Sequence, residues 1–139
     1  MISDIEKPVY PELIREKESG KDGVGVKKEE FEVKGRCLVV HLKQEVDHHY
    51  AEQLVKNVNY LMDKYIVRNV LFDFEKVGFM DSSGIGMVVG RCKKTKNLGG
   101  QVVVCNMSER VDRILRISGV YRLVEKKKDV TEALQELME

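Results

Sequence analysis

The chain has 139 residues, of which 42% are hydrophobic and 34% charged, and its 24 basic residues nearly balance 23 acidic ones. This length fits one compact domain, and the formal net charge of +1 excludes a protein whose overall field attracts nucleic acid or an anionic membrane. No stretch approaches the roughly 18 apolar residues of a membrane span, and Asp4, Glu6 and Pro8 near the start do not resemble a secretory signal. We therefore expect a cytoplasmic protein that recognises its partners through a local surface.

The first 28 residues differ from the rest of the chain. They are rich in glutamate and lysine and end in the glycine-containing stretch ESGKDGVGVKK, which argues against regular structure. Their apolar residues have a spacing that suits one side of a short helix: Ile2, Ile5, Val9, Leu13 and Ile14. Because Pro8 and Pro11 interrupt such a helix, we expect residues 1–28 to form a flexible tail, with a docked segment as the alternative.

The next elements alternate between apolar strands and amphipathic helices. Gly35 separates a short alternating strand that starts at Phe31 from the apolar run 37–42, which predicts a hairpin whose first strand lies antiparallel at or near a sheet edge. A helix of about four turns follows, with apolar residues at three- and four-residue spacing from Ala51 to Tyr65. The run NVLFDF, residues 69–74, then has the length of a buried strand.

The second half of the chain repeats this alternation. A second helix has Ile85, Val88, Val89 and Cys92 on one face and ends at Gly99 and Gly100. The strand QVVVC follows, and then a helix that Ser108 begins as N-cap and Gly119 ends. A short strand is expected around Leu123 and Val124, followed by a last amphipathic helix with Thr131 within its start.

This order of elements predicts an α/β fold, with a single domain at residues 29–139. Strand–helix alternation requires right-handed crossovers and a mixed, mostly parallel sheet, here of about five strands with about four helices. The cysteines have no C-x-x-C spacing, and Cys37 and Cys105 fall in apolar strands, so we expect these two to be buried. Loops at the carboxyl ends of the strands usually carry function, and two are rich in polar residues: QEVDHHYAE and VGFMDSSGIG.

The second loop is compatible with several kinds of site. Gly84, Gly86 and Gly90 have the spacing G-x-G-x-x-x-G, one residue away from the dinucleotide fingerprint. Neither Ser82 nor Ser83 has a glycine two residues before it, as a nucleophile elbow requires. A nucleotide cradle and a nucleophilic serine are therefore both disfavoured.

The histidines offer little support for catalysis or metal binding. His41 falls on a strand, and His48 and His49 are adjacent in the first loop, where they point in different directions. Together with Asp47 they lack a further ligand cluster, so we expect residues that pack or cap near a helix start.

Two interpretations of the serines remain from chemistry alone. Asp81, Ser82 and Ser83 are typical helix-capping residues. A phosphoserine at the first turn of a helix is also tolerated, because free amide groups and the positive end of the macrodipole favour its charge. Phosphorylation there would leave the fold intact and change the surface that a partner meets.

Three segments in this order resemble the STAS domain family, and in particular its bacterial anti-sigma factor antagonists of the sporulation type: EVDHHYAE at 45–52, FMDSSGIG at 79–86 and GGQVVVCNMSERVDRILRISGV at 99–120. The resemblance covers about residues 29–139. It implies a small α/β domain that is not an enzyme and needs no cofactor.

The resemblance also implies a partner and a switch. The partner would be an anti-sigma factor that is a serine kinase with an ATP site, whose sigma factor is released when the antagonist binds. The kinase would phosphorylate Ser82, the serine after the aspartate of the MDSSG motif, and a PP2C-type phosphatase would restore the free form. The alternatives are a STAS subunit of a larger stress-signalling assembly and, as a third, a hydrolase that uses Ser82.

The resemblance assigns roles to both loops. Asp81 would orient Ser82 or contact the kinase, while Ser83 would pack or cap at the helix start. Gly84 and Gly86 would allow the backbone of the partner to approach. The expected partner surface comprises Asp47, His48, His49, Asp81, Ser82, Ser83, Gly84, Ile85 and Gly86. This chain departs from the family at Gln44, where a glycine is common, so the backbone of that turn is expected to differ.

Overall fold

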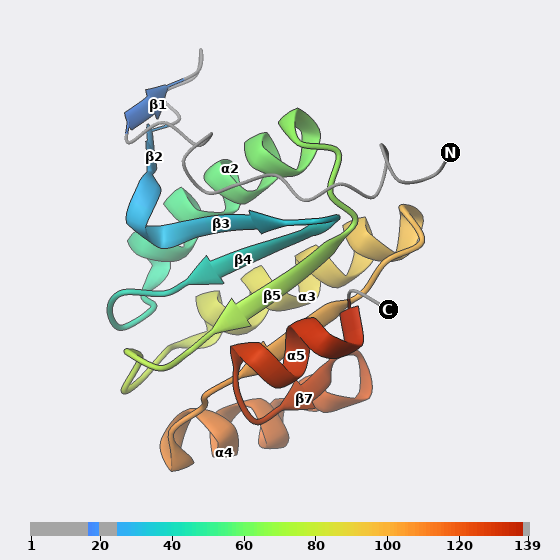
Figure 1. The fold of residues 1–139 in the computed structure, drawn as a ribbon. Helices are drawn as coiled ribbons and strands as arrows, with labels where there is room; N and C mark the ends of the chain where they lie inside the picture. The colour runs from blue at the N-terminus through green and yellow to red at the C-terminus, as the bar shows by residue number, and fades with distance from the viewer. Residues whose placement is uncertain (1–16, 20–24, 138–139) are drawn as a thin grey trace.

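The computed structural model describes residues 17–19 and 25–137. Its centre is a five-stranded sheet in the order β3-β4-β5-β6-β7 (Figure 1). The strands are β3 (Phe31–Lys34), β4 (Cys37–His41), β5 (Asn69–Asp73), β6 (Val102–Cys105) and β7 (Glu125–Lys127). The β3–β4 pair is antiparallel and the other three pairs are parallel, which confirms the mixed, mostly parallel sheet with its antiparallel strand at the edge.

Four α-helices of the described residues cover this sheet. They are α2 (His48–Lys64), α3 (Ser82–Asn97), α4 (Glu109–Ser118) and α5 (Val130–Leu137). In the view of Figure 1, α2 and α3 lie behind the sheet and α5 lies in front of it. Short 3₁₀ turns occupy Lys28–Glu30 (η2) and Val120–Arg122 (η3). No helix within residues 17–19 and 25–137 has the length and apolar character needed to cross a membrane.

The sheet is buried on both faces, which explains why its central strands are almost continuously apolar. On one face Phe31, Leu38 and Phe72 pack among the apolar residues of α2, α3 and α4. On the other, a smaller cluster forms around Ala133 of α5 and includes Cys37 and Cys105. Burial raises the pKa of both thiols to about 12, so both are protonated, unreactive core residues, as expected.

The turns and helix ends expected from the sequence are present. Gly35 closes the β3–β4 hairpin with φ 60°, and Gly119 ends α4 with φ 83°, both in the left-handed region that favours glycine. The hydroxyl of Ser108 accepts a hydrogen bond from the amide of Val111 at 3.2 Å, and Thr131 lies in the first turn of α5.

The position of the last strand differs from the prediction. Val120–Arg122 forms η3, Leu123 is 56% exposed, and the strand begins only at Glu125. Its sequence, EKK, is entirely charged and follows no apolar strand pattern. As the edge of the sheet, β7 is held by backbone pairing to β6 and needs no buried side chains of its own.

The packed part of the chain begins before residue 29. Strand β2 (Gly25–Lys27) pairs antiparallel with β1 (Lys17–Ser19), and Val26 is fully buried in the main core. The side chain of Asn57 on α2 donates a hydrogen bond to the carbonyl of Gly25 at 3.1 Å. The rest of the expected tail, 1–16 and 20–24, lies outside the described residues.

Candidate functional site

The two loops that the sequence singled out lie side by side. Val46 and Met80 form an isolated parallel β-bridge. The amide of Val46 donates to the carbonyl of Phe79 at 3.2 Å, and the amide of Asp81 donates to the carbonyl of Val46 at 3.1 Å. Backbone groups therefore fasten the loop before α2 to the loop before α3, so that both helices begin at one end of the sheet.

Each of these helices begins with an aspartate as N-cap. Oδ1 of Asp47 accepts a hydrogen bond from the amide of Tyr50 at 2.8 Å, and Oδ1 of Asp81 accepts one from the amide of Ser83, also at 2.8 Å. These carboxylates satisfy amide groups that a helix start leaves free and complement the positive end of the macrodipole. Asp81 thus has a structural role, while its contact with a partner stays a prediction.

The two serines differ in accessibility. Ser82 is the first residue of α3 and is exposed, whereas Ser83 is half-buried. The hydroxyl of Ser83 lies 3.5 Å from Nδ1 of His48 at the start of α2. Of the two hydroxyl groups, that of Ser82 is therefore the easier for an external enzyme to reach.

The glycines of the motif serve different purposes. Gly84 is buried, and a Cβ atom there would lie 2.8 Å from Sδ and 3.1 Å from Cβ of Met80, so its absence allows α3 to pack on its own preceding loop. Gly86 is exposed, and nothing lies within 4 Å of a Cβ built there. Of these two glycines, only Gly86 lies at the surface, next to the half-buried Ile85.

The two histidines of the first loop diverge. His48 points toward Ser83 on the α3 side of α2, while Nε2 of His49 lies 3.4 Å from Nε2 of Gln53 on its own helix. Both side chains are exposed. His49 lines a separate pocket with Gly25 and Tyr50, so of this pair only His48 borders the serine loop.

The backbone at Gln44 does not need a glycine. Its φ is not positive; the non-glycine residues with positive φ in the described part of the chain are Ile66 and Asn106. Gln44 is exposed, and the loop reaches the Val46–Met80 bridge with an ordinary backbone. The departure from the family at this position therefore imposes no strain on the turn.

An aromatic residue beside the serines was missed by the sequence analysis. Phe79 is 36% exposed, and the guanidinium carbon of Arg110 on α4 lies 4.7 Å from the centroid of its ring. This distance is typical of a cation–π contact. The sequence shows a phenylalanine directly before the MDSSG motif, which could have been named as a candidate partner residue. Its contact with Arg110, 31 positions later, could not be predicted from the sequence.

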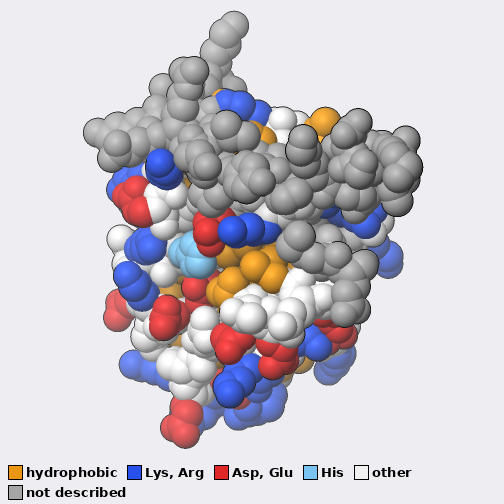
Figure 2. Space-filling view, viewed as in Figure 1, with side chains coloured by type: hydrophobic (Ala, Val, Ile, Leu, Met, Phe, Trp, Pro, Cys, Tyr) orange, Lys and Arg blue, Asp and Glu red, His pale blue; other side chains and the backbone are white. Residues whose placement is uncertain are grey.

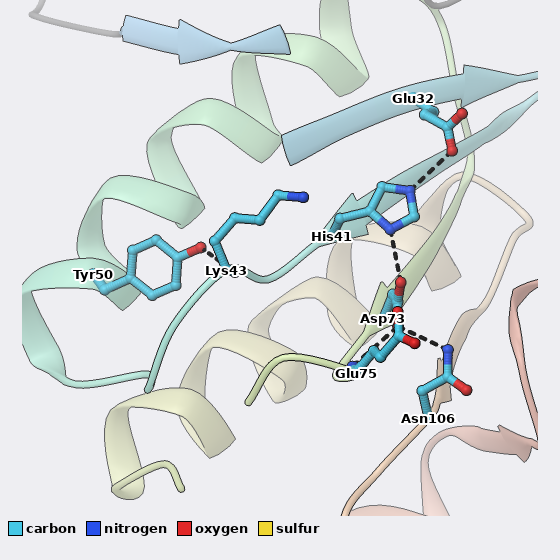
Figure 3. A network of polar contacts seen from close by, with 7 residues as sticks. All are labelled: Glu32, His41, Lys43, Tyr50, Asp73, Glu75 and Asn106. Carbon is cyan, nitrogen blue, oxygen red and sulfur yellow. Dashed lines mark hydrogen bonds and ion pairs between the residues drawn. The ribbon is translucent and has the colours of Figure 1, made fainter. Parts of the chain in front are cut away.

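A second polar cluster lies on the face of the sheet opposite α2 and α3 (Figure 3). Nδ1 of His41 lies 2.7 Å from Asp73 and its Nε2 lies 2.9 Å from Glu32. Asp73 also accepts hydrogen bonds from the side chain of Asn106 at 2.9 Å and from the amide of Glu75 at 3.1 Å. The cluster thus joins β3, β4 and β5 to the end of β6.

The protonation equilibria of this cluster are coupled. The hydrogen bond to Asp73 raises the pKa of His41 above its usual value, although burial acts against this. Burial would raise the pKa of Asp73, but the hydrogen bonds from His41, Asn106 and Glu75 outweigh it and hold that pKa below its usual value. The two carboxylates therefore stabilise the protonated form of His41 relative to that of a free imidazole. The sequence placed His41 on a strand correctly, but its partners come from neighbouring strands.

The described part of the face seen in Figure 1 carries both charges. In Figure 2, which shows the same view, acidic and basic side chains are interspersed around a small hydrophobic area. This mixture agrees with the near-neutral composition. Within the described residues, no three histidine, cysteine, aspartate or glutamate side chains are grouped so that they could hold a metal ion.

Comparison with known proteins assigns the chain to a family. The model of the STAS domain matches residues 29–133. The chain is 30% identical over 100 residues to the anti-sigma F factor antagonist of Paenibacillus polymyxa, an alignment that covers 72% of this chain and 86% of that protein.

Solved structures agree with this assignment. The structure of the anti-sigma factor antagonist SpoIIAA in its unphosphorylated form is similar with a TM-score of 0.68 at 29% identity, covering 76% of this chain and 92% of that one. The structure of the Bacillus cell fate determinant SpoIIAA in its phosphorylated form gives a TM-score of 0.59 at 28% identity, with 73% and 90% covered. With its five-stranded sheet, its two joined loops and these matches, the chain belongs to the STAS domain family.

Proposed function

We propose that this protein is an anti-sigma factor antagonist whose docking to its partner is switched off by phosphorylation of Ser82. The partner is an anti-sigma factor that acts as a serine kinase, and a PP2C-type phosphatase reverses the modification. The observation that carries the proposal is the exposed hydroxyl of Ser82 at the first turn of α3, beside the loop that precedes α2. The similarity to SpoIIAA, whose structure has been solved in a phosphorylated form, supports it.

The position of Ser82 suits a phosphate that changes binding without unfolding the protein. The start of α3 offers the positive end of a helix dipole to the added charge of about −1.5 to −2. The first N–H groups of the helix can also donate to phosphate oxygens. The fold therefore tolerates the modification, while the surface beside Asp81 becomes strongly negative and solvated.

The proposed docking surface surrounds this hydroxyl. Its centre is formed by Ser82, Ile85 and Gly86 of α3. Asp47 and His48, at the start of α2, lie beside them. The other predicted residues lie at its border or beneath it: His49, Asp81, Ser83 and Gly84. We add Phe79 with Arg110, because both are exposed, they contact each other beside the serine loop, and arginine is among the residue types enriched where binding energy concentrates. Since each 1.4 kcal/mol is tenfold in affinity, the loss of one charge-assisted contact and one new repulsion suffice to weaken docking about a hundredfold.

The first experiment tests the acceptor. The purified protein is incubated with ATP and a soluble extract of its source cells in which the pathway is active, and its phosphopeptides are mapped. Ser82→Ala removes the acceptor, and Ser83→Ala is the matched control one residue away. We expect phosphate on Ser82 in the unmodified protein and in Ser83→Ala, and none on this loop in Ser82→Ala.

The second experiment tests the switch. Phosphorylated and free protein are compared for binding to the ATP-dependent kinase recovered from that extract, by titration calorimetry. We expect about a hundredfold weaker binding of the phosphorylated form, and Ser82→Ala should bind as well as the free form. Equal affinities of the two forms would rule out the switch even if Ser82 is phosphorylated.

A further inference from the structure

A polar pocket separate from the serine loop lies between β2, η2 and the first half of α2. Its volume is about 250 Å³, below the range of about 300 to 1,000 Å³ that is usual for drug-sized ligands. A pocket of this size suits a short chain that ends in one polar group. Its wall includes the buried side chains of Glu30, Tyr50 and Asn57 and the exposed side chains of Lys27 and His49.

Glu30 is a buried carboxylate with too few partners for its charge. Only 6% of the residue is exposed, and Oε2 accepts a hydrogen bond from the hydroxyl of Tyr50 at 2.8 Å. Among the described residues, no other donor and no cationic nitrogen contacts this carboxylate. Buried carboxylates normally have a cationic partner or several hydrogen bonds, because removing the charge from water is costly. The remaining acceptor capacity of Glu30 is therefore available to a group in the pocket.

The partner of Glu30 within the chain is neutral. The hydroxyl of Tyr50 accepts a hydrogen bond from the amide of Lys43 at 2.9 Å (Figure 3), so its own hydrogen is left for Glu30. Burial raises the pKa of Tyr50, which keeps this hydroxyl protonated. Tyr50 thus donates one hydrogen bond without balancing the charge, and the pocket lacks a positive group.

The other walls of the pocket suit a cation on an apolar stem. Leu54 and the ring of Tyr50 provide surface for methylene groups. Nδ2 of Asn57 donates to the carbonyl of Gly25 at 3.1 Å, which leaves Oδ1 of Asn57 as an acceptor. Lys27 also lines the pocket, but it is exposed and its ammonium makes no ion pair with Glu30.

We propose that this pocket binds an organic cation, a guanidinium or primary ammonium group on a short apolar stem, which pairs with Glu30. Such a group supplies the charge-assisted hydrogen bonds that the carboxylate lacks. It can belong to a free small amine or to an arginine or lysine side chain of a partner, because His49 lines the pocket at the border of the proposed docking surface. Only this second source rests on the proposed function.

Titration of the isotope-labelled full-length protein with n-butylguanidinium, followed by nuclear magnetic resonance, tests the pocket. The neutral control of similar shape is n-butylurea. We expect saturable shifts of the amide signals of Gly25, Tyr50 and Asn57 with n-butylguanidinium, and at least about tenfold weaker binding of n-butylurea.

Glu30→Gln removes the charge and keeps an acceptor for Tyr50, so this variant should fold and bind n-butylguanidinium about tenfold more weakly. Glu29→Gln is the matched control, since Glu29 is exposed, lies next to Glu30 and does not line the pocket. It should bind as the unmodified protein does. Circular dichroism verifies that both variants are folded, and the comparison with n-butylurea needs no variant.

Three results would overturn the proposal. The first is the absence of saturable binding, or equal binding of n-butylguanidinium and n-butylurea, in the unmodified protein. The second is unchanged affinity in a folded Glu30→Gln variant. The third is binding that appears only in Lys27→Met, which would show that Lys27 itself occupies the pocket.

The source of the cation is tested with the kinase recovered from the extract. If a basic side chain of the partner fills the pocket, then Glu30→Gln weakens docking about tenfold and n-butylguanidinium competes with it, while Glu29→Gln docks normally. Unchanged docking, with n-butylguanidinium bound in the free protein and in the complex, would identify a free amine as the ligand. A kinase that does not bind the unmodified protein would instead contradict the proposed function, and the titration would still measure the pocket.

Discussion

At the scale of single residues, two glycines of the serine loop are expected to affect different properties: Gly84 the stability of the fold, and Gly86 the binding of the partner. Gly84→Ala places a Cβ atom 2.8 Å from Sδ of Met80, and the nearby Cβ of Met80 at 3.1 Å limits how far that side chain can move away. We expect a loss of about 1 to 3 kcal/mol in the free energy of unfolding, as is usual for overpacking. Urea denaturation measures this directly, and an unchanged midpoint would show that the loop shifts without difficulty.

Gly86→Ala is the matched substitution two residues later. Open space surrounds that position, and alanine is favoured over glycine in a helix by up to about 1 kcal/mol. We expect equal or higher stability together with weaker docking to the kinase, because the new methyl group stands on the proposed partner surface. Unaltered affinity would remove Gly86 from that surface.

At the scale of helices, the N-cap aspartates stabilise the two helix starts that form the candidate site. Asp81→Ala removes the side-chain acceptor of the Ser83 amide at the start of α3 and should lower the free energy of unfolding by about 1 kcal/mol. Asp81→Asn keeps an acceptor and should recover most of this loss. If Asp81 also contacts the kinase through its charge, then the asparagine variant is stable but binds weakly, which calorimetry and urea denaturation distinguish together.

Helix starts could be predicted from the sequence in part. Ser108 is the expected N-cap of α4, and Asp81 is the one of three candidate residues that caps α3, because capping depends on local chemistry. The strand β7 was misplaced because its charged sequence gives no apolar pattern, and pairing to β6 determines where it starts. The contact of Arg110 with Phe79 could not be predicted from the sequence either, because it depends on how α4 packs against the loop before α3.

At the scale of the whole molecule, the His41 cluster predicts how stability depends on pH. The folded protein raises the pKa of His41, so the stability that this residue contributes is fully present below its unfolded pKa of about 6.5 and is lost as the pH rises through the folded value. Asp73 has a lowered pKa, and its contribution is lost only as the pH falls through that lower value. We therefore expect the free energy of unfolding to decrease as the pH rises above about 6.5 and through the raised pKa of His41.

The matched test replaces His41 or His49 by glutamine and measures urea denaturation from pH 5.5 to 9. The His41 variant should lose much of this pH dependence, whereas His49→Gln, at an exposed position outside the cluster, should keep it. Identical profiles for all three proteins would show that other groups control stability in this range. The cluster was invisible in the sequence because Glu32, His41 and Asp73 meet only when three strands pair in register.

The bridge between Val46 and Met80 makes the site tolerant of sequence change. The two hydrogen bonds that join the loops use only main-chain groups, which every residue except proline supplies on the donor side. Side chains around the bridge, such as Gln44 and His48, can therefore be exchanged while the spacing of the loops is conserved. Surface substitutions can therefore change which partner the protein binds, while the main-chain hydrogen bonds keep the two loops in the same relative position.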